Sequence, residues 1–297
     1  MDNLEEVVVF VNETKREGIP NGSVWVYNDM GQGYNPDILG EDVGCGMAAF
    51  KISKDVNLKK AADEIAKSLK GIRILGSGNH FVDLCSPMRV FDKWVKNEWI
   101  DFSDFKHNTT DKSQFLILHT DAKTIMDKTP VSFKEADEKM QIAQNFRDKL
   151  GNDLAKLIGS KIIEKYGDWT HNSVERKDGK IIYRKGAIKV LSGKIHIFPV
   201  SLGNPILFYT VDGNYIPPYN SMPHASGRKV KTGDFKASLE SVSEFRKLIY
   251  IPEEVKDNSL RAEHPDCFNT LNDFTDEFKL YFNSIGEVNI IAYVGKI

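Results

Sequence analysis

Apolar residues recur at helical spacing in two stretches of the chain. The first stretch predicts a helix over residues 58–69, with Gly71 following it as the C-cap. The second predicts a long helix that begins at a capping box formed by Ser132 and Glu135. The apolar face of this helix carries Met140, Ala143, Phe146, Leu150, Leu154 and Leu157. Gly151 interrupts the stretch and is a position where we expect the helix to break.

Short β-branched and apolar runs predict strands between the helices. The predicted strands cover residues 7–11, 115–118, 195–198, 206–210 and 288–294. Residues 212–220 and 227–234 are rich in glycine, proline, asparagine and charge, which predicts loops. The two element types are mixed without regular βαβ alternation, so we expect an α+β fold. No long linker divides the chain, and we predict a single domain over residues 1–297.

The composition is that of an ordinary globular protein. Hydrophobic residues make up 41% of the 297 residues and charged residues 28%, which permits a sizeable core. The net charge of −2 argues against a basic coat for gripping duplex nucleic acid, although a local basic groove stays open. Three cysteines do not make a disulfide framework, so we expect a reducing compartment. The acidic start MDNLEEVVVF lacks the bases of a secretory signal, and no stretch approaches the roughly 20 apolar residues of a membrane span. We therefore expect a cytoplasmic protein without a membrane partner.

Five segments place a cysteine or histidine in company that favours ligand binding. They are GEDVGCGM with Asp42 and Cys45, LGSGNHF with His80, FLILHTDAK with His119, THNSVE with His171, and NSMPHASGR with His224. A carboxylate and a thiolate three residues apart, flanked by glycines, can bind one cation or bridge two. Taken alone, Cys45 is better explained as a small buried hydrophobe, because free cysteines are commonly found in protein interiors.

The histidines allow similar alternatives. His80 follows a glycine-rich turn that lacks the spacing of a dinucleotide site. His119 ends an apolar strand, where a lone histidine is commonly a core residue, and His171 lies in a polar loop. His224 precedes small residues and the cation Arg228, which suits a phosphorylated or nucleotidylated site but also a solvated basic loop. We interpret the remaining histidines as surface or structural: His107, His196 and His264.

Taken together and in order, these five segments resemble the RtcB family of RNA ligases. The segments RKGAI at 184–188 and PVSLGN at 199–204 are also similar to family segments, as is the C-terminal Val294-Gly295-Lys296. The resemblance runs from about Gly40 to the C-terminus, and residues 1–39 are compressed relative to the family. It implies an RtcB-like fold of packed β-sheets flanked by helices around a central metal and nucleotide cleft.

The resemblance also implies a GTP-dependent, manganese-dependent RNA ligase. His224 would become guanylated, and the enzyme would join an RNA 3′-phosphate or 2′,3′-cyclic phosphate to a 5′-hydroxyl, in RNA repair or tRNA splicing, with an activating protein as a possible partner. Two Mn²⁺ ions would be bound by Asp42, Cys45, His80, His119 and His171. The nucleotide or its phosphates would be contacted by Asn79, Asp83, Asn172, Ser201, Arg228 and Lys296. Manganese follows from the resemblance alone, because cysteine and histidine ligands favour zinc.

The sequence departs from the family mainly where RNA ends would bind. After His119 the family has a serine-arginine pair, whereas this chain has Asp121-Ala122-Lys123. The lysine supplies a positive charge but cannot form the bidentate hydrogen bonds of an arginine guanidinium. Asp83 stands where the family has a glutamate, and Val200 where it has a glycine. Three alternatives to a ligase remain: a metal-dependent phosphodiesterase or cyclic phosphatase, a non-catalytic RNA- or nucleotide-binding paralogue, and a protein with a structural zinc site.

Overall fold

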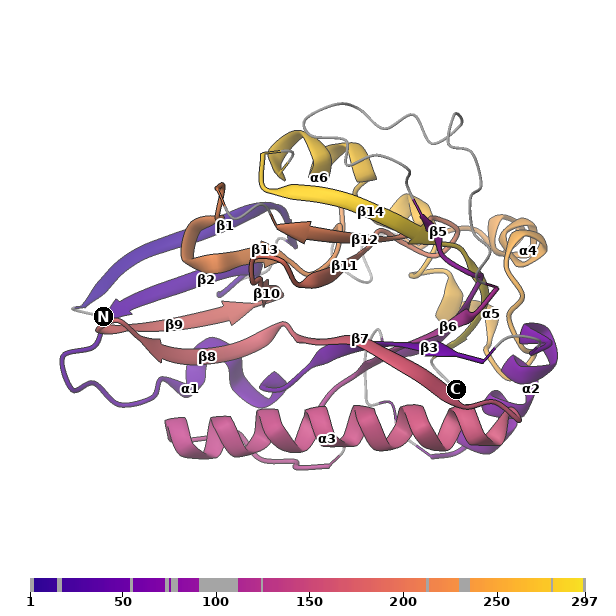
Figure 1. The fold of residues 1–297 in the computed structure, drawn as a ribbon, viewed down its shortest axis with the longest axis horizontal. Helices are drawn as coiled ribbons and strands as arrows, with labels where there is room; N and C mark the ends of the chain where they lie inside the picture. The colour runs from indigo at the N-terminus through magenta and orange to yellow at the C-terminus, as the bar shows by residue number, and fades with distance from the viewer. Residues whose placement is uncertain are drawn as a thin grey trace.

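The computed structural model describes residues 3–14, 18–53, 56–72, 75, 80–90, 112–123, 125–211, 214–229, 236–278 and 280–295. Within these ranges the chain is a mixed α and β protein whose named strands form several antiparallel sheets, as Figure 1 shows. The expected mixture of helices and strands without regular βαβ alternation is therefore observed. No helix in the described ranges has the length and apolar character needed to cross a membrane.

A five-stranded sheet lies at the centre of the molecule. Its order is β15 (Ile290–Gly295), β4 (Phe81–Cys85), β6 (Gln114–Thr120), β3 (Gly46–Ile52) and β7 (Ile162–Thr170). One face is covered by the helices α2 (Leu58–Leu69) and α3 (Phe133–Leu157), and α3 runs along the whole lower side in Figure 1. Side chains alternate along β3, so Ala48 and Phe50 pack toward these helices while Met47 and Ala49 face the opposite side.

The opposite face packs against a four-stranded sheet. Its order is β11 (Ile195–Pro199), β12 (Ile206–Val211), β14 (Phe282–Val288) and β5 (Arg89–Val90). Phe115 and Ile117 of β6 meet Phe208 of β12 in the core between the two sheets. The central sheet is therefore buried on both faces, which explains why β3 and β6 are nearly continuous apolar runs.

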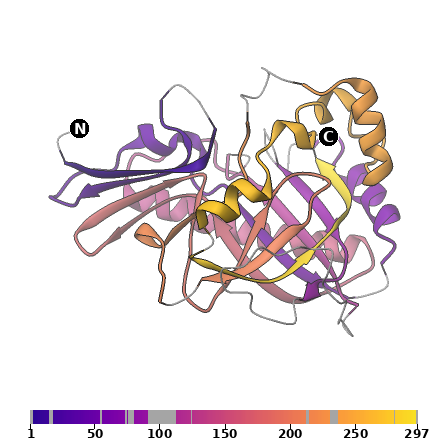
Figure 2. The same cartoon turned by 90° about the horizontal axis from the view of Figure 1, so that it is seen from above.

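A third sheet forms one end of the molecule, where the indigo strands lie in Figure 2. Its order is β1 (Leu4–Thr14), β2 (Asn21–Asn28), β9 (Lys180–Lys185) and β8 (Asn172–Lys177). A two-stranded sheet of β10 (Ala187–Lys189) and β13 (Ser221–Pro223) lies beside it. The shorter helices are α1 (Pro36–Leu39), α4 (Leu239–Leu248), α5 (Asp257–Leu260) and α6 (Leu271–Phe278), and the 3-10 turns are η1 (Gly40–Asp42), η2 (Pro218–Asn220) and η3 (Pro265–Cys267).

Both helices predicted from periodicity are present. The side chain of Ser132 accepts a hydrogen bond from the Glu135 amide at 3.2 Å, which confirms the N-cap of α3. The expected break at Gly151 is wrong, because α3 continues through it. A Cβ at Gly151 would lie 2.7 Å from the Phe50 ring, so the glycine lets the helix approach β3 closely. Leu157, expected on the apolar face, is 44% exposed at the helix end.

The strand predictions are confirmed with one correction. The predicted strands at 7–11, 115–118, 195–198 and 206–210 lie within β1, β6, β11 and β12. The predicted single strand at 288–294 is wrong, because Val288 ends β14 in one sheet and Ile290 begins β15 in the other. Asn289 is therefore the crossover between the two packed sheets. The predicted loop at 212–220 ends in η2, and residues 230–234 of the second predicted loop lie outside the described ranges.

Candidate metal centre

The candidate ligands meet at one end of the five-stranded sheet. Strands β3 and β4 begin at this end and β6 and β7 finish there, because all four run antiparallel to their neighbours. In the register, His119 of β6 lies opposite Met47 of β3 and Phe81 of β4, and Gly46 lies opposite Thr170. Cys45, His80, His119 and His171 each adjoin or belong to one of these strand ends. Antiparallel pairing thus gathers residues far apart in the sequence.

Cys45, His119 and His171 form the tightest group at this end. One ligand atom from each of them lies within 4.8 Å of the other two. The backbone reinforces the arrangement, because the His171 amide donates to the Cys45 carbonyl at 2.9 Å. The side chain of His171 is buried, and its Nδ1 has no hydrogen-bond partner among the described residues. A buried thiol with two imidazoles and an unsatisfied ring nitrogen has the donor chemistry of a transition-metal site.

His80 joins this group from the side of β4. Its Nε2 lies 3.4 Å from the Cys45 sulfur, almost the same as the 3.5 Å from that sulfur to Nε2 of His119. Its other ring nitrogen, Nδ1, lies 3.7 Å from the carboxylate of Asp121, which is also buried. Asp121, which belongs to the segment that departs from the family's serine-arginine pair, thus lies behind a candidate ligand.

Asp42 is placed differently from the other predicted ligands. Its carbonyl accepts a hydrogen bond from the Cys45 amide at 3.0 Å, so it shapes the turn that carries the cysteine. Its side chain is exposed and is not a member of the three-residue group found in the described part of the chain. Its carboxylate is close enough to affect the pKa of Cys45.

His224 lies directly against the group, although it is distant in sequence. It follows β13, and its ring stacks on that of His171 with centroids 4.1 Å apart. Its backbone amide and its Nδ1 both contact the Gly186 carbonyl, at 3.2 and 2.7 Å. Because a carbonyl only accepts, Nδ1 must carry the proton in this contact, and Nε2 of His224 keeps its lone pair.

Burial controls the protonation of these groups. It lowers the pKa of His171 well below its usual range, and the neighbouring His224 and His119 lower it further. Burial also lowers the pKa of His224, whereas the hydrogen bond to Gly186 raises it. Burial raises the pKa of the Cys45 thiol, as does Asp42, while the Arg147 guanidinium lowers it. The imidazoles of His171 and His224 are therefore neutral near pH 7. Metal binding would displace a proton from Cys45.

Two of the predicted nucleotide contacts have defined places near the site. Asn172 follows His171, and its side-chain oxygen accepts a hydrogen bond from the Gly186 amide at 2.8 Å. It therefore holds the segment whose carbonyl contacts His224. Asp83 is 1% exposed on β4, opposite Ile117 and Tyr293 in the register. Burial raises its pKa well above the usual range, and its Oδ1 has no hydrogen-bond partner within the described ranges.

Ser201 and Arg228 belong to two loops that pack together. The Ser226 amide donates to the Pro199 carbonyl at 3.2 Å, which brings the loop of Ser201 against the loop that follows His224. The buried guanidinium of Arg228 forms an ion pair with Glu263 at 2.9 Å and donates to the Ala262 carbonyl at 2.6 Å. Its predicted contact with phosphate stays a prediction. Asn79 and Lys296 lie outside the described residues.

Sequence reasoning missed two buried cations on α3 beneath the site. Lys139 and Arg147 are both fully buried, and both lie on the apolar face that includes Ala143. Lys139 donates to the carbonyls of Glu41 at 2.9 Å and Lys128 at 2.8 Å. A charged residue on the apolar stripe of an amphipathic helix was the available signal, because such residues are almost never fully buried unless paired.

Comparisons with known proteins add no family. No protein-family model matches the chain, and no curated protein is significantly similar to it.

Proposed function

We propose that this protein is a GTP- and metal-dependent RNA ligase of the RtcB type, with His224 as the nucleophile that carries GMP. The observation that carries the proposal is the position of His224 against the candidate metal centre. The ring centroids of His224 and His171 lie 4.1 Å apart, and Nδ1 of His224 is held by the Gly186 carbonyl. The nitrogen left for nucleophilic attack is Nε2.

The donor set fits a divalent transition metal. Cys45, His119 and His171 would hold one ion, and His80 is close enough to the Cys45 sulfur to contribute. A bound cation would neutralise phosphate oxygens and polarise the reacting phosphate. Soft thiolate and imidazole ligands favour zinc over manganese, so the choice of Mn²⁺ and of a second ion depends on the resemblance to the family.

The chain's own residues supply the first chemical step. The lone pair on Nε2 of His224 attacks the α-phosphorus of GTP, a P–N bond forms, and the bond to pyrophosphate breaks. The proton on Nδ1 stays in its hydrogen bond to Gly186. The lowered pKa of His224 keeps its ring neutral, which an attacking imidazole requires. An RNA 3′-phosphate then takes GMP from the histidine, and the 5′-hydroxyl of the second end displaces GMP.

Two observations favour a second candidate, a metal-dependent phosphodiesterase or cyclic phosphatase without ligation. Arg228 is the predicted phosphate-binding cation, and its guanidinium is engaged with Glu263 in the interior. The change to Asp121 also places a carboxylate where the family carries a serine-arginine pair. The first feature concerns the binding of nucleotide phosphates and the second the binding of RNA ends, and both leave the candidate metal ligands intact.

The experiment incubates the protein with Mn²⁺ and GTP radiolabelled at the α-phosphate, followed by a denaturing gel. Wild type should carry a label that is stable to base and lost in acid, as for a histidine phosphoramidate, and His224→Ala should carry none. His196→Ala is a matched control, because His196 is also buried but contacts the backbone of Leu191. If wild type acquires no label but hydrolyses a 2′,3′-cyclic phosphate, the result would instead support the phosphodiesterase.

A further inference from the structure

Arg147 lies on the buried face of α3, beside the turn that carries Cys45. Its guanidinium donates to both carboxylate oxygens of Asp168, at 2.8 and 2.7 Å. The same group donates to the Gly44 carbonyl at 2.9 Å and to the Thr170 hydroxyl at 3.2 Å. One planar cation thus joins the helix to two separate strand ends of the central sheet.

The two strand ends are those that lead into the candidate ligands. Gly44 directly precedes Cys45, and Thr170 directly precedes His171. A Cβ at Gly46 would lie 3.0 Å from Nη2 of Arg147 and 2.8 Å from the Trp169 carbonyl. The guanidinium therefore packs tightly against the backbone on both sides of the cysteine.

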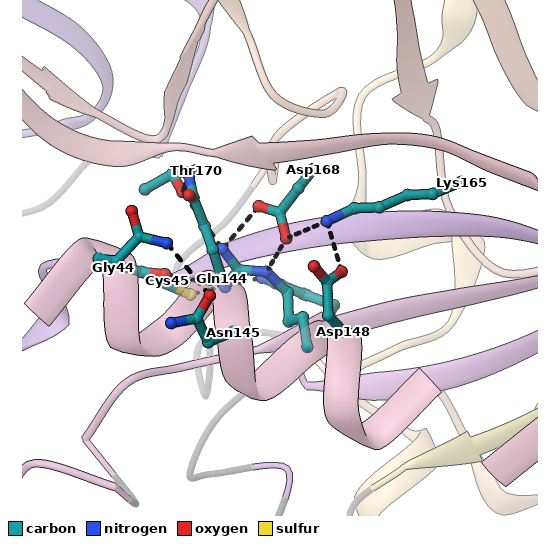
Figure 3. Close-up of polar contacts among 11 residues, drawn as sticks. Gly44, Cys45, Gln144, Asn145, Asp148, Lys165, Asp168 and Thr170 are labelled. Carbon is teal, nitrogen blue, oxygen red and sulfur yellow. Dashed lines mark hydrogen bonds and ion pairs between the residues drawn. The ribbon is translucent and has the colours of Figure 1, made fainter. Parts of the chain in front are cut away.

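Further contacts hold Arg147 in a single orientation. Lys165 lies 3.8 Å from the Asp168 carboxylate and also pairs with Asp148 of α3. Gln144 donates to the Thr170 hydroxyl at 3.3 Å. Figure 3 shows Gly44, Cys45, Asp168 and Thr170 gathered at the side of the helix from which Gln144 and Asp148 project.

Helix packing alone does not require a cation here. Leu150 and Leu154 of α3 already pack against the same sheet. A buried ion pair loses hydration, and replacing such a pair by apolar residues is often neutral or stabilising. The planar guanidinium of arginine offers several N–H donors at fixed angles, which an apolar residue lacks.

We propose that Arg147 is the positioning residue of the candidate metal centre, fixing the separation of Cys45 and His171 through Gly44 and Thr170. The proposal rests on the proposed metal centre. Lysine cannot replace it, because one ammonium does not reproduce the planar, multi-donor geometry that spans Asp168, Gly44 and Thr170.

The test measures Co²⁺ binding to purified full-length protein by titration and by the visible absorption spectrum. Arg147→Lys should weaken Co²⁺ binding by about 10- to 100-fold, the range seen when residues that orient metal ligands are changed, and should alter the spectrum. Asp168→Asn is the second variant, because it keeps the side-chain shape and removes the charge that orients Arg147; we expect a smaller loss of Co²⁺ affinity.

Arg246→Lys is the matched control. Arg246 likewise joins a carboxylate, that of Asp257, to the carbonyls of Ile251 and Val255. Arg246→Lys should lower the melting temperature without changing the Co²⁺ dissociation constant or the spectrum. If both site variants bind Co²⁺ with the wild-type constant and spectrum, the positioning role is overturned while the metal centre stands. If wild type binds no Co²⁺, both fall, and GTP labelling then decides separately whether His224 is a nucleophile.

Discussion

The imidazole of His224 stacks on that of His171, with ring centroids 4.1 Å apart and planes inclined by 29°. The hydrogen bond from Nδ1 to the Gly186 carbonyl holds the same ring at its edge. Together these contacts define both the plane and the rotation of the ring. Nε2 of His224 is therefore held in one orientation, which the proposed role as a nucleophile would require.

Changing Gly186 should disturb this ring. Gly186 has φ of +64°, and a Cβ there would lie 2.7 Å from the Gly22 amide nitrogen. We expect Gly186→Ala to move the carbonyl that holds His224, to lower guanylation at least tenfold, and to destabilise the protein by about 1–3 kcal/mol. Gly179→Ala is the control, because Gly179 has a similar φ of +73° with open space around it. Equal labelling of the two variants would argue against a role for the Gly186 carbonyl.

Removing the cysteine should abolish stabilisation by metal. A ligand present at a hundredfold excess over its dissociation constant stabilises a folded protein by about 2.7 kcal/mol. We expect Mn²⁺, Co²⁺ or Zn²⁺ to raise the melting temperature of wild type, a chelator to reverse this, and Cys45→Ala to show no shift. Cys85→Ala should behave as wild type toward metal, because Cys85 lies at the opposite end of β4 from His80. A full shift in Cys45→Ala would place the bound metal elsewhere.

Asp83 should make the protein less stable as pH rises. Burial raises its pKa in the folded protein above the value of the unfolded chain, about 3.9, so the folded state binds more protons between the two values. The free energy of unfolding therefore falls as pH rises through this window. We expect Asp83→Asn to be more stable than wild type near pH 7 and to lose this advantage toward pH 4, measured by urea unfolding at several pH values. A constant difference across that range would contradict a neutral Asp83.

Gly151 should be a position where alanine destabilises a helix. Alanine normally favours a helix interior by about 1 kcal/mol over glycine. Here the added Cβ would lie 2.7 Å from the Phe50 ring, so we expect Gly151→Ala to lower the free energy of unfolding by about 1–3 kcal/mol. Phe50→Leu should relieve the clash, and the double variant should lose less stability than the sum of the two single changes. Additive losses would show that the two positions do not compete for space.

Local sequence patterns predicted which helices and strands exist better than they predicted where each one begins and ends. The periodicity of residues 58–69 and the cap at Ser132 depend on neighbours in sequence, and both helices are found. The predicted helix break at Gly151 was wrong because the reason for a glycine there, close packing against the Phe50 ring, lies on a strand that is distant in the sequence. The prediction of one strand at 288–294 was wrong because Asn289, where the chain changes sheets, looks the same in sequence as a single polar position within one continuous strand.

The sequence by itself determined which residues are candidates for the proposed chemistry: one thiol and several histidines in glycine-rich or strand-end segments, with a histidine before a cationic loop. Only the tertiary structure decided that Cys45, His119 and His171 meet, because antiparallel register places their strand ends together. It also decided that Asp42 stays exposed, that Arg228 pairs with Glu263, and that Arg147 is buried beneath the site. These outcomes depend on contacts between segments far apart in the chain, which spacing along a single segment does not encode.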